Sequence, residues 1–515
     1  MNNYHKFHIP VMGTAFTADT PLKVAQYGIN SVVSIVDDVL LERLRKVYCE
    51  KNGFSYTEIT KKNKDHRAHR ITSYLNLIHE LTNKKVQEFT TLTKEKFEDI
   101  KKYYSLLPNS SEIKQEFFKI IESSFDFEDL QEWLIKNFAV GSIDVNIMTK
   151  VDKTNFHKNE ELSVEYNDAH AALRGFAKSN LESSVIFSAG MNPRLYGYIS
   201  NFEDFYPNIN GKIKKKIVLK VSDYRSAIIQ GKFLAKKGLW VSEYRIESGL
   251  NCGGHAFATD GLLMGPILDE FRENRQALIN QTFEVLVDSL TKLDRIVPKE
   301  KLKIKITAQG GVGTSDEQEF LINHYNLDSV GWGTPFLLVP EVTTVDDSTR
   351  NKLIHAKEED LYLSQVSPLG VPFNNLRNNS KDNERDKKIS EGKPGSSCPR
   401  RFLALSKEYD KQGICSASRK FQKIKINESK KNHFSLDKFF EKTCLCVGLS
   451  AAAVINNKID IKESKAVSIC PGPNLAYFSS LMSLKEISHH IYGIKESVVR
   501  EDRPHFFVKE LELYV

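Results

Sequence analysis

Two glycine-rich stretches, about twenty residues apart, have the composition of an anion-binding site. The apolar run 304–308 leads into Gln309-Gly310-Gly311-Val312-Gly313-Thr314, and an acidic segment typical of a helix start follows. Glycines let backbone N–H groups converge on one anion, and a helix N-terminus adds favourable partial charge. The second stretch, Gly331-Trp332-Gly333-Thr334, ends the next apolar segment. Their order predicts one phosphate cradle built from both stretches; the alternative is two tight turns that bind nothing.

A histidine follows a third glycine-rich turn, in Ser248-Gly249-Leu250-Asn251-Cys252-Gly253-Gly254-His255. Imidazole titrates near neutral pH, so a histidine in a site can accept or donate a proton there. The two preceding glycines allow close approach of a flat ligand to the backbone. His255 is therefore the candidate catalytic acid or base, and the simpler interpretation is a structural or surface histidine. We interpret Cys252 as a small packing residue rather than a nucleophile, because the sequence shows no basic partner for it.

These turns need a scaffold that brings the ends of several strands to one place. Eight short apolar segments recur along the chain with helix-length stretches between them, which is typical of parallel βα units. The segments are 7–13, 29–35, 141–148, 184–189, 216–221, 239–247, 303–308 and 329–331. Eight such units close a barrel whose active sites lie at the carboxyl ends of the strands. The chain is therefore predicted to be an α/β protein with a (β/α)₈ TIM barrel.

Other parts of the chain fall outside that strand–helix alternation. Residues 54–140 contain no glycine and repeat their apolar residues at helical spacing, which predicts a helical insertion over 51–140, after the second strand. This insertion would form a lid, a dimer surface or a packed cap. The barrel would then comprise 1–50 and 141–378. The polar stretch 379–397 predicts a linker, and 398–515 is interpreted as a C-terminal extension near the barrel mouth.

Five of the seven cysteines stand in this C-terminal extension. Four convergent thiolates would bind an iron–sulfur cluster or zinc. No Cys-x-x-Cys spacing is present, so reduced thiols that fill a packed domain are the preferred interpretation, and metal ligands stay unassigned. The five residues are Cys398, Cys415, Cys444, Cys446 and Cys470.

The bulk composition is typical of a soluble globular protein, with 40% hydrophobic and 27% charged residues over 515 positions. The net charge of +7 comes from scattered lysine runs rather than a continuous basic stripe, which argues against a nucleic-acid partner. No apolar run reaches the length of a membrane span, and the first residues lack the apolar core of a signal peptide. A low, odd number of cysteines is typical of a reducing compartment. We expect a cytoplasmic protein without a membrane partner.

Five motifs occur in the same order as in the nitronate monooxygenases, once called 2-nitropropane dioxygenases, and the chain resembles this family over roughly 7–49 and 141–378. The motifs are Ile9-Pro10-Val11-Met12-Gly13, Asp144-Val145-Asn146-Ile147, Cys252-Gly253-Gly254-His255, Ala308-Gln309-Gly310-Gly311-Val312-Gly313 and Gly331-Trp332-Gly333-Thr334-Pro335-Phe336.

The resemblance implies an FMN-dependent oxidoreductase that does not use NAD. Met12, Gly13 and Asn146 would lie at the isoalloxazine ring, and His255 would remove the proton next to the nitro group of a small nitroalkane. The flavin would take an electron from the nitronate, and O₂ would complete the monooxygenase reaction. The remaining cofactor contacts, around the phosphate, would be Gly310, Gly311, Gly331, Trp332, Gly333 and Thr334.

The chain also departs from the family's pattern. Asn251-Cys252 replaces the family's Glu-Ala before Gly-Gly-His, and the bulky Trp332 precedes the second phosphate glycine. These departures leave the substrate and electron donor open. A flavin-dependent enoyl reductase of fatty-acid or polyketide synthesis, which would use NAD(P)H, is the second interpretation, because such enzymes share the barrel and its Gly-Gly loop. A flavin-binding partner subunit without turnover is the third, and a homo-oligomer also stays open.

Overall fold

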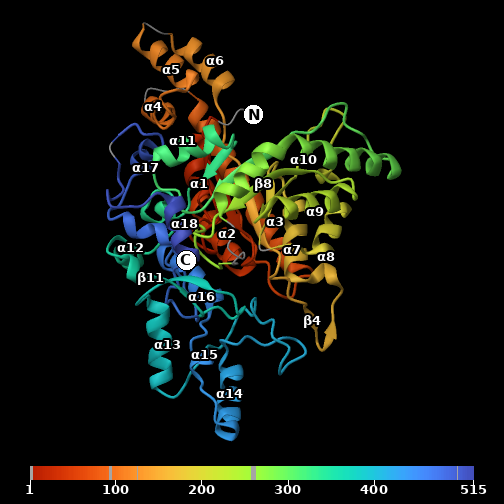
Figure 1. The fold of residues 1–515 in the computed structure, drawn as a ribbon, viewed down its shortest axis with the longest axis vertical. Helices are drawn as coiled ribbons and strands as arrows, with labels where there is room; N and C mark the ends of the chain where they lie inside the picture. The colour runs from red at the N-terminus through yellow and green to blue at the C-terminus, as the bar shows by residue number, and fades with distance from the viewer. Residues whose placement is uncertain (1–3, 92–95, 124–125, 189, 257–262, 496) are drawn as a thin grey trace.

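The computed structural model describes residues 4–91, 96–123, 126–188, 190–256, 263–495 and 497–515, and its centre is a closed barrel of parallel strands (Figure 1). The strands pair in the order β1-β10-β9-β8-β7-β6-β3-β2. Their bounds are β1 (Phe7–Ile9), β2 (Asn30–Ser34), β3 (Ile143–Met148), β6 (Ser184–Ser188), β7 (Lys216–Val221), β8 (Val241–Glu247), β9 (Lys305–Gln309) and β10 (Ser329–Gly331). Each of the eight predicted segments overlaps one of these strands, so the prediction of a TIM barrel is confirmed. One predicted strand ended at Ala189, which lies outside the described residues.

The strands are apolar because both of their faces are covered. Parallel strands in a barrel carry helices outside and side chains inside, so they read as continuous apolar runs rather than alternating ones. Val32, Ile186 and Val218 form a small cluster of their own, separate from the main core. They come from β2, β6 and β7, and branched side chains of this kind fill the interior of such barrels. The barrel is therefore a packed core whose ligands must bind at its mouth.

The predicted helical insertion divides into two parts with different roles. Helix α3 (His66–Thr90) packs between α2 (Asp38–Asn52) and α7 (Asp168–Ala177), so it belongs to the helical layer around the barrel. Gly175 of α7 permits this packing, since a Cβ there would lie 2.8 Å from the side chain of Ile71. Helical spacing predicts the helices of 51–140 but not this contact of α3 with the helical layer, because it reveals an apolar face and not its partner.

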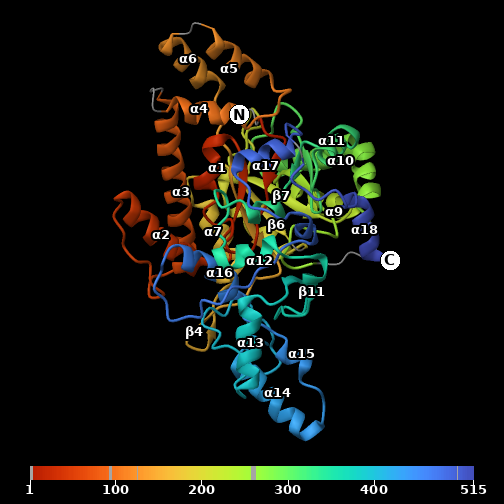
Figure 2. The ribbon, with the colours of Figure 1, turned by 90° about the vertical axis from the view of Figure 1, so that its left-hand side faces the viewer.

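The second part of that region projects away from the barrel. It consists of α4 (Phe97–Ser105), α5 (Glu112–Glu122) and α6 (Phe127–Asn137), which lie together at one end of the molecule in both views (Figures 1 and 2). Tyr104 stacks on Phe117 with ring centroids 4.1 Å apart, and Trp133 packs against both. These aromatic contacts hold the three helices together and are continuous with the main core of the protein.

The polar stretch predicted as a linker forms a helix instead. Most of 379–397 is α13 (Ser380–Ser390), and the side chain of Asn379 caps it by accepting hydrogen bonds from two backbone N–H groups. The ammonium of Lys381 pairs with Glu384 at 2.6 Å, and a second lysine pairs with the same carboxylate one turn later. Ion pairs and a capping amide stabilise a helix without an apolar face, so polarity alone was a misleading sign of a linker.

The C-terminal extension contributes α14 (Arg419–Asn432), α15 (Asp437–Phe440), α16 (Leu445–Asn456), α17 (Leu484–Ile491) and α18 (Phe506–Tyr514). Helices α13, α14 and α15 lie at the end of the molecule opposite α4–α6 (Figures 1 and 2). By length and composition alone, one segment of the described residues, 437–456, could cross a membrane; 67% of its apolar window is buried in the protein, and it is divided between α15 and α16.

Two buried ion pairs fasten this extension to the barrel. Arg503 contacts Glu317 of α11 (Ser315–His324) at 2.7 Å, and the two side chains are 4% and 2% exposed. Arg400 pairs with Asp37, at the start of α2, and both of these side chains are also buried. A buried charge is costly without its partner, so each pair holds the extension in place.

Removal of Arg503 tests how much this fastening contributes. The Arg503→Met protein should lose about 3–5 kcal/mol of unfolding free energy in urea, because Glu317 stays buried with an uncompensated charge. The matched control is Lys292→Met, which removes an exposed pair with Asp288 and should change stability by less than about 1 kcal/mol. Equal effects of the two substitutions would contradict a fastening role for Arg503.

Candidate active site

A cavity of about 170 Å³ lies where the barrel strands end, beneath the C-terminal extension. Its floor is polar and comes from the carboxyl ends of successive strands: Ser34, Asn146, Ser188, Lys220, Glu247 and Gln309. Its roof is largely apolar and comes from the extension: Phe402, Leu403, Leu445, Cys446 and Leu449. The carboxyl face is where barrels of this kind keep their active sites. We therefore take this cavity as the candidate active site.

The floor combines a charged pair with unsatisfied acceptors. Lys220 and Glu247 form an ion pair of 2.6 Å, and the amide of Gln309 donates to Glu247 at 2.7 Å. By contrast, Asn146 Oδ1 and Thr14 Oγ1 are buried and have no hydrogen-bond partner among the described residues. A buried polar atom without a partner costs about 1–3 kcal/mol. A polar ligand in the cavity would satisfy both atoms, so they point to one.

His255 lies at the side of the cavity and is held from two directions. Its Nε2 forms a hydrogen bond of 2.6 Å with Ser367 Oγ, and its ring packs edge-on against Phe373 with centroids 4.9 Å apart. The backbones of His255 and Phe373 also form a β-bridge. Burial lowers the pKa of His255 to about 4, so the imidazole is neutral at pH 7 and able to accept a proton, although it is a weak base.

The predicted phosphate-binding glycines lie together, but protein atoms fill the space in front of them. They face the loop that follows β8 rather than the cavity. A Cβ on Gly310 would lie 3.0 Å from Asn251 Cα, and a Cβ on Gly311 would lie 2.5 Å from Leu250 Cδ1. A Cβ on Gly333 would lie 2.7 Å from Cys252 Cβ. In this arrangement the glycines allow a close approach of the chain to itself.

Two of the backbone N–H groups beside these glycines already have an acceptor. Gly313 N and Thr314 N donate to the carboxylate of Glu317, which caps α11. The guanidinium of Arg503 pairs with that carboxylate and donates to the carbonyl of Gly311 at 2.6 Å. A helix N-terminus binds an external anion through free N–H groups. Here the carboxylate of Glu317 takes the place of an external anion at the N-terminus of α11.

The extension covers the second glycine turn as well. Gly472 N donates to Thr334 Oγ1 at 3.0 Å, and the Asn474 amide donates to the carbonyl of Val312 at 2.9 Å. Protein atoms therefore lie against both turns in this conformation, and the glycines of the two turns do not line the cavity. The cavity beside them is close in size to one that binds benzene, ~150 Å³, and smaller than the ~300 Å³ at which pockets for drug-sized ligands begin.

The predicted site residues thus fall into two groups. Gly13, Asn146 and His255 line the cavity, whereas Met12 is buried outside its lining. Trp332 is fully buried and donates its indole N–H to Gln318 of α11, which gives it a packing role. The remaining residues outside the lining are Gly310, Gly311, Gly331, Gly333 and Thr334. The cofactor contacts assigned to all of these residues stay predictions.

Several lining residues were missed in the sequence. Lys220 and Glu247 stand at the carboxyl ends of two strands that were predicted correctly, so a polar residue at a strand end was the available signal. The roof residues Phe402, Leu403 and Leu449 had no such signal, because nothing local to them indicates contact with the barrel mouth.

The cysteines do not gather into a metal site. Among the residues that the structure describes, which include all seven cysteines, no group of three or more His, Cys, Asp or Glu side chains is arranged to hold a metal ion. Cys470 is buried where the extension crosses the loop after β8, its carbonyl oxygen 2.0 Å from the position of a Cβ on Gly253. Cys446 lines the cavity.

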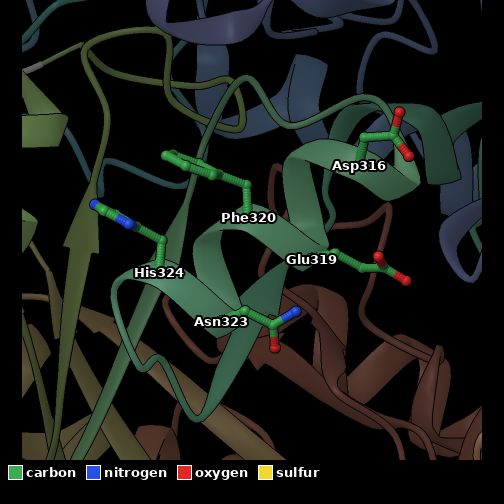
Figure 3. Close-up of a pocket in the computed structure, with 5 residues that line it drawn as sticks. All are labelled: Asp316, Glu319, Phe320, Asn323 and His324. Carbon is green, nitrogen blue, oxygen red and sulfur yellow. The ribbon is translucent and has the colours of Figure 1, made fainter.

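Two larger hollows lie away from this mouth. One of about 460 Å³ lies at the opposite end of the barrel, around the first residues of its strands. The other, of about 520 Å³, is an open depression on the outer face of α11. All five residues that line it belong to this helix (Figure 3): Asp316, Glu319, Phe320, Asn323 and His324. Position favours the smaller cavity as the active site, since barrel chemistry occurs at the carboxyl ends of strands.

No protein-family model matches the chain, and a search of curated proteins finds no match. Among solved structures, FabK from Thermotoga maritima aligns over 76% of this chain and 83% of its own, with 13% identity and a TM-score of 0.34. The enoyl reductase domain of MlnA, from the macrolactin biosynthesis cluster of Bacillus amyloliquefaciens, aligns over 76% of this chain and 88% of its own, with 12% identity and a TM-score of 0.38. Nitroalkane oxidase from Streptomyces ansochromogenes aligns over 75% of this chain and 85% of its own, with 10% identity and a TM-score of 0.33. These activities are the neighbours' own; the barrel is established here by its strand pairing.

The depressed pKa of His255 gives a direct titration test. Its ring resonances, assigned by their loss in His255→Gln, should titrate near pH 4 rather than near 6.5. The unfolded chain binds this proton at higher pH, so the stability contributed by neutral His255 should fall as the pH drops from 6.5 to 4. His255→Gln should lose less stability over this window than the unsubstituted protein, and a midpoint above 6 would contradict the burial of the ring.

Proposed function

We propose that the chain is an FMN-dependent oxidoreductase that acts on a small carbon acid, of the kind that nitroalkanes represent. The observation that carries this proposal is the cavity at the carboxyl mouth, which places the unsatisfied oxygen of Asn146 and the neutral ring of His255 beside one space. The same residues belong to the motifs that resemble nitronate monooxygenases. A reactive cofactor positioned there would supply electron transfer, and the protein would supply placement and charge.

FMN fits this site only in part. The cavity offers polar contacts for part of a ring system at Asn146, Thr14 and Lys220, but the glycine turns do not line it. Contact of the cofactor's phosphate with the turns would require residues 250–252 of the loop 248–255 and residues 472–474 of the extension to move away from them. Asn251 within that loop has a positive φ of 34°, which side chains rarely adopt, so its present backbone conformation is strained.

His255 would act on the substrate rather than on the cofactor. The imidazole is neutral at pH 7, and its Nε2 exchanges a hydrogen bond with Ser367, which orients the ring. Proton removal next to an electron-withdrawing group is within reach of a weak base when the carbon acid is itself activated. The ion pair of Lys220 and Glu247 lies on the floor of the same cavity and gives it one group of each charge, with no net charge.

One observation favours a second candidate function, an enoyl reductase that uses NAD(P)H. The roof of the cavity is formed by apolar side chains of the extension, among them Phe402, Leu403 and Leu445. An alkenyl chain would be desolvated favourably against such a surface, by about 25 cal/mol for each Å² of apolar area buried. Reduction of bound flavin by NADPH under argon would favour this candidate over the monooxygenase.

Flavin binding is the first test of the proposal. The protein should bind both FMN and riboflavin, and Asn146→Leu should weaken the binding of both about tenfold, because it removes one hydrogen-bonding group from the cavity. Asn323→Leu, on the exposed face of α11, is the matched control and should leave the affinities unchanged. Tighter binding of FMN than of riboflavin would report a phosphate contact. No binding of either flavin at ~100 μM, well above the Kd of a specific ligand, would overturn the cofactor assignment.

Turnover separates a base from a positioning residue. His255→Ala should keep flavin affinity and lose about 10²–10⁴ in the rate with a neutral nitroalkane, while the already ionised nitronate should react almost as before. His355→Ala removes an exposed histidine and serves as the control. Equal losses on both substrate forms would make His255 a positioning residue, and no turnover by the unsubstituted protein with either substrate class would favour a non-catalytic flavin-binding subunit.

A further inference from the structure

Two cysteines of the C-terminal extension lie next to each other beside the candidate site. The segments that carry them run side by side: Ser396 N donates to the carbonyl of Ala417 at 3.0 Å, and Arg419 N donates to the carbonyl of Ser396 at 2.8 Å. Cys415 packs with Ala417 in a small buried cluster, and Cys398 packs against that cluster. Each of the two thiols also affects the acidity of the other. The two side chains therefore share one small cluster before any rearrangement.

The two thiols differ in exposure and in acidity. Cys398 is partly exposed between two exposed neighbours, Ser397 and Pro399, whereas Cys415 is buried. The neighbouring Cys415 thiol, together with the backbone N–H and the charge of Arg401, lowers the pKa of Cys398 to about 7. The same contact and burial raise the pKa of Cys415 well above its usual range. A reachable thiolate beside a protonated thiol is the arrangement found in redox-sensing cysteines.

We propose that Cys398 and Cys415 are a redox-active thiol pair that a hydroperoxide converts into a disulfide. The Cys398 thiolate attacks one oxygen of hydrogen peroxide, the O–O bond breaks, and the hydroxide that leaves takes up a proton to become water. Cys398 is thereby oxidised to a sulfenic acid and the peroxide is reduced. The Cys415 thiol then attacks the sulfenic sulfur, which forms the S–S bond and releases a second water. A reducing thiol of the surroundings would restore the pair by exchange.

The remaining cysteine near this pair suits a different role. Cys446 lines the cavity and accepts a hydrogen bond from the backbone of Leu403, and burial raises its pKa well above the usual range. A protonated, buried thiol is a slow nucleophile, so it should react after the pair.

The position of the pair links it to the roof of the candidate site. The chain between Cys398 and Cys415 carries Arg400, which is fastened to the barrel through Asp37, and Phe402, which lines the roof. A disulfide would close this stretch of chain into a ring. The pair's reactivity does not depend on the proposed flavin function, and it can be tested in protein without any cofactor.

The first experiment uses the unsubstituted full-length chain. It is reduced, freed of reductant and treated with hydrogen peroxide, and its thiols are counted and mapped by mass spectrometry. Two of the seven thiols should disappear together, in one disulfide that joins Cys398 to Cys415. Buried Cys49, whose pKa is raised by burial, is an internal reference and should react at least about tenfold more slowly. Reaction of Cys49 at the same rate, or a disulfide between other cysteines, would overturn the proposal.

Substitutions then separate the two roles. Cys415→Ser should leave a sulfenic acid on Cys398 that dimedone traps, and Cys398→Ser should abolish the rapid phase. Cys49→Ser is the matched control and should behave as the unsubstituted chain does. The thermal midpoint of each variant reports its folding, and the peptide map of the unsubstituted chain decides the question if a variant does not fold. Disulfide formation at an unchanged rate in Cys398→Ser would show that another residue is the nucleophile.

Discussion

The buried carboxylate of Glu317 is the point on which the arrangement of the barrel mouth depends. It accepts hydrogen bonds from the backbone N–H groups of Gly313, Thr314 and Phe506, and it pairs with Arg503. One charge thereby joins the glycine turn after β9, the first turn of α11 and the start of α18. Because an unpaired buried charge is far more costly than a paired one, the turn and the extension are held in one arrangement.

That docking converts the open mouth of a barrel into an enclosed space. The strands supply the polar floor, since their carboxyl ends carry Asn146, Lys220 and Glu247, while the extension supplies apolar side chains above it. The side chains of Lys220 and Glu247 are 17% and 26% exposed, so this ion pair acts through a lower effective dielectric than a fully exposed pair would. Burial also accounts for the neutral state of His255, because it is the cause that lowers the pKa of that residue.

Local features of the chain could be predicted, and contacts between distant residues could not. The strands followed from apolar segments, and His255 followed from its place after a strand. Helix α13 was missed because a polar helix held by Asn379 and by lysine–glutamate pairs has no apolar face to detect. The roof was missed for another reason. It depends on side chains that lie far along the chain from the strands they cover, and the spacing of apolar residues does not reveal such a contact.

The glycine turns show how one pattern can have two physical causes. A glycine permits close approach to its backbone, and the approaching group can be a ligand or the chain itself. Here the chain approaches, through Asn251 and Gly472, and the nearby charges agree with this arrangement. A phosphate needs positive charge that is not already neutralised, yet the guanidinium of Arg503 is paired with Glu317. An anion between the turns would have to compete with a carboxylate already in place, so the charge of Arg503 decides whether this mouth accepts one.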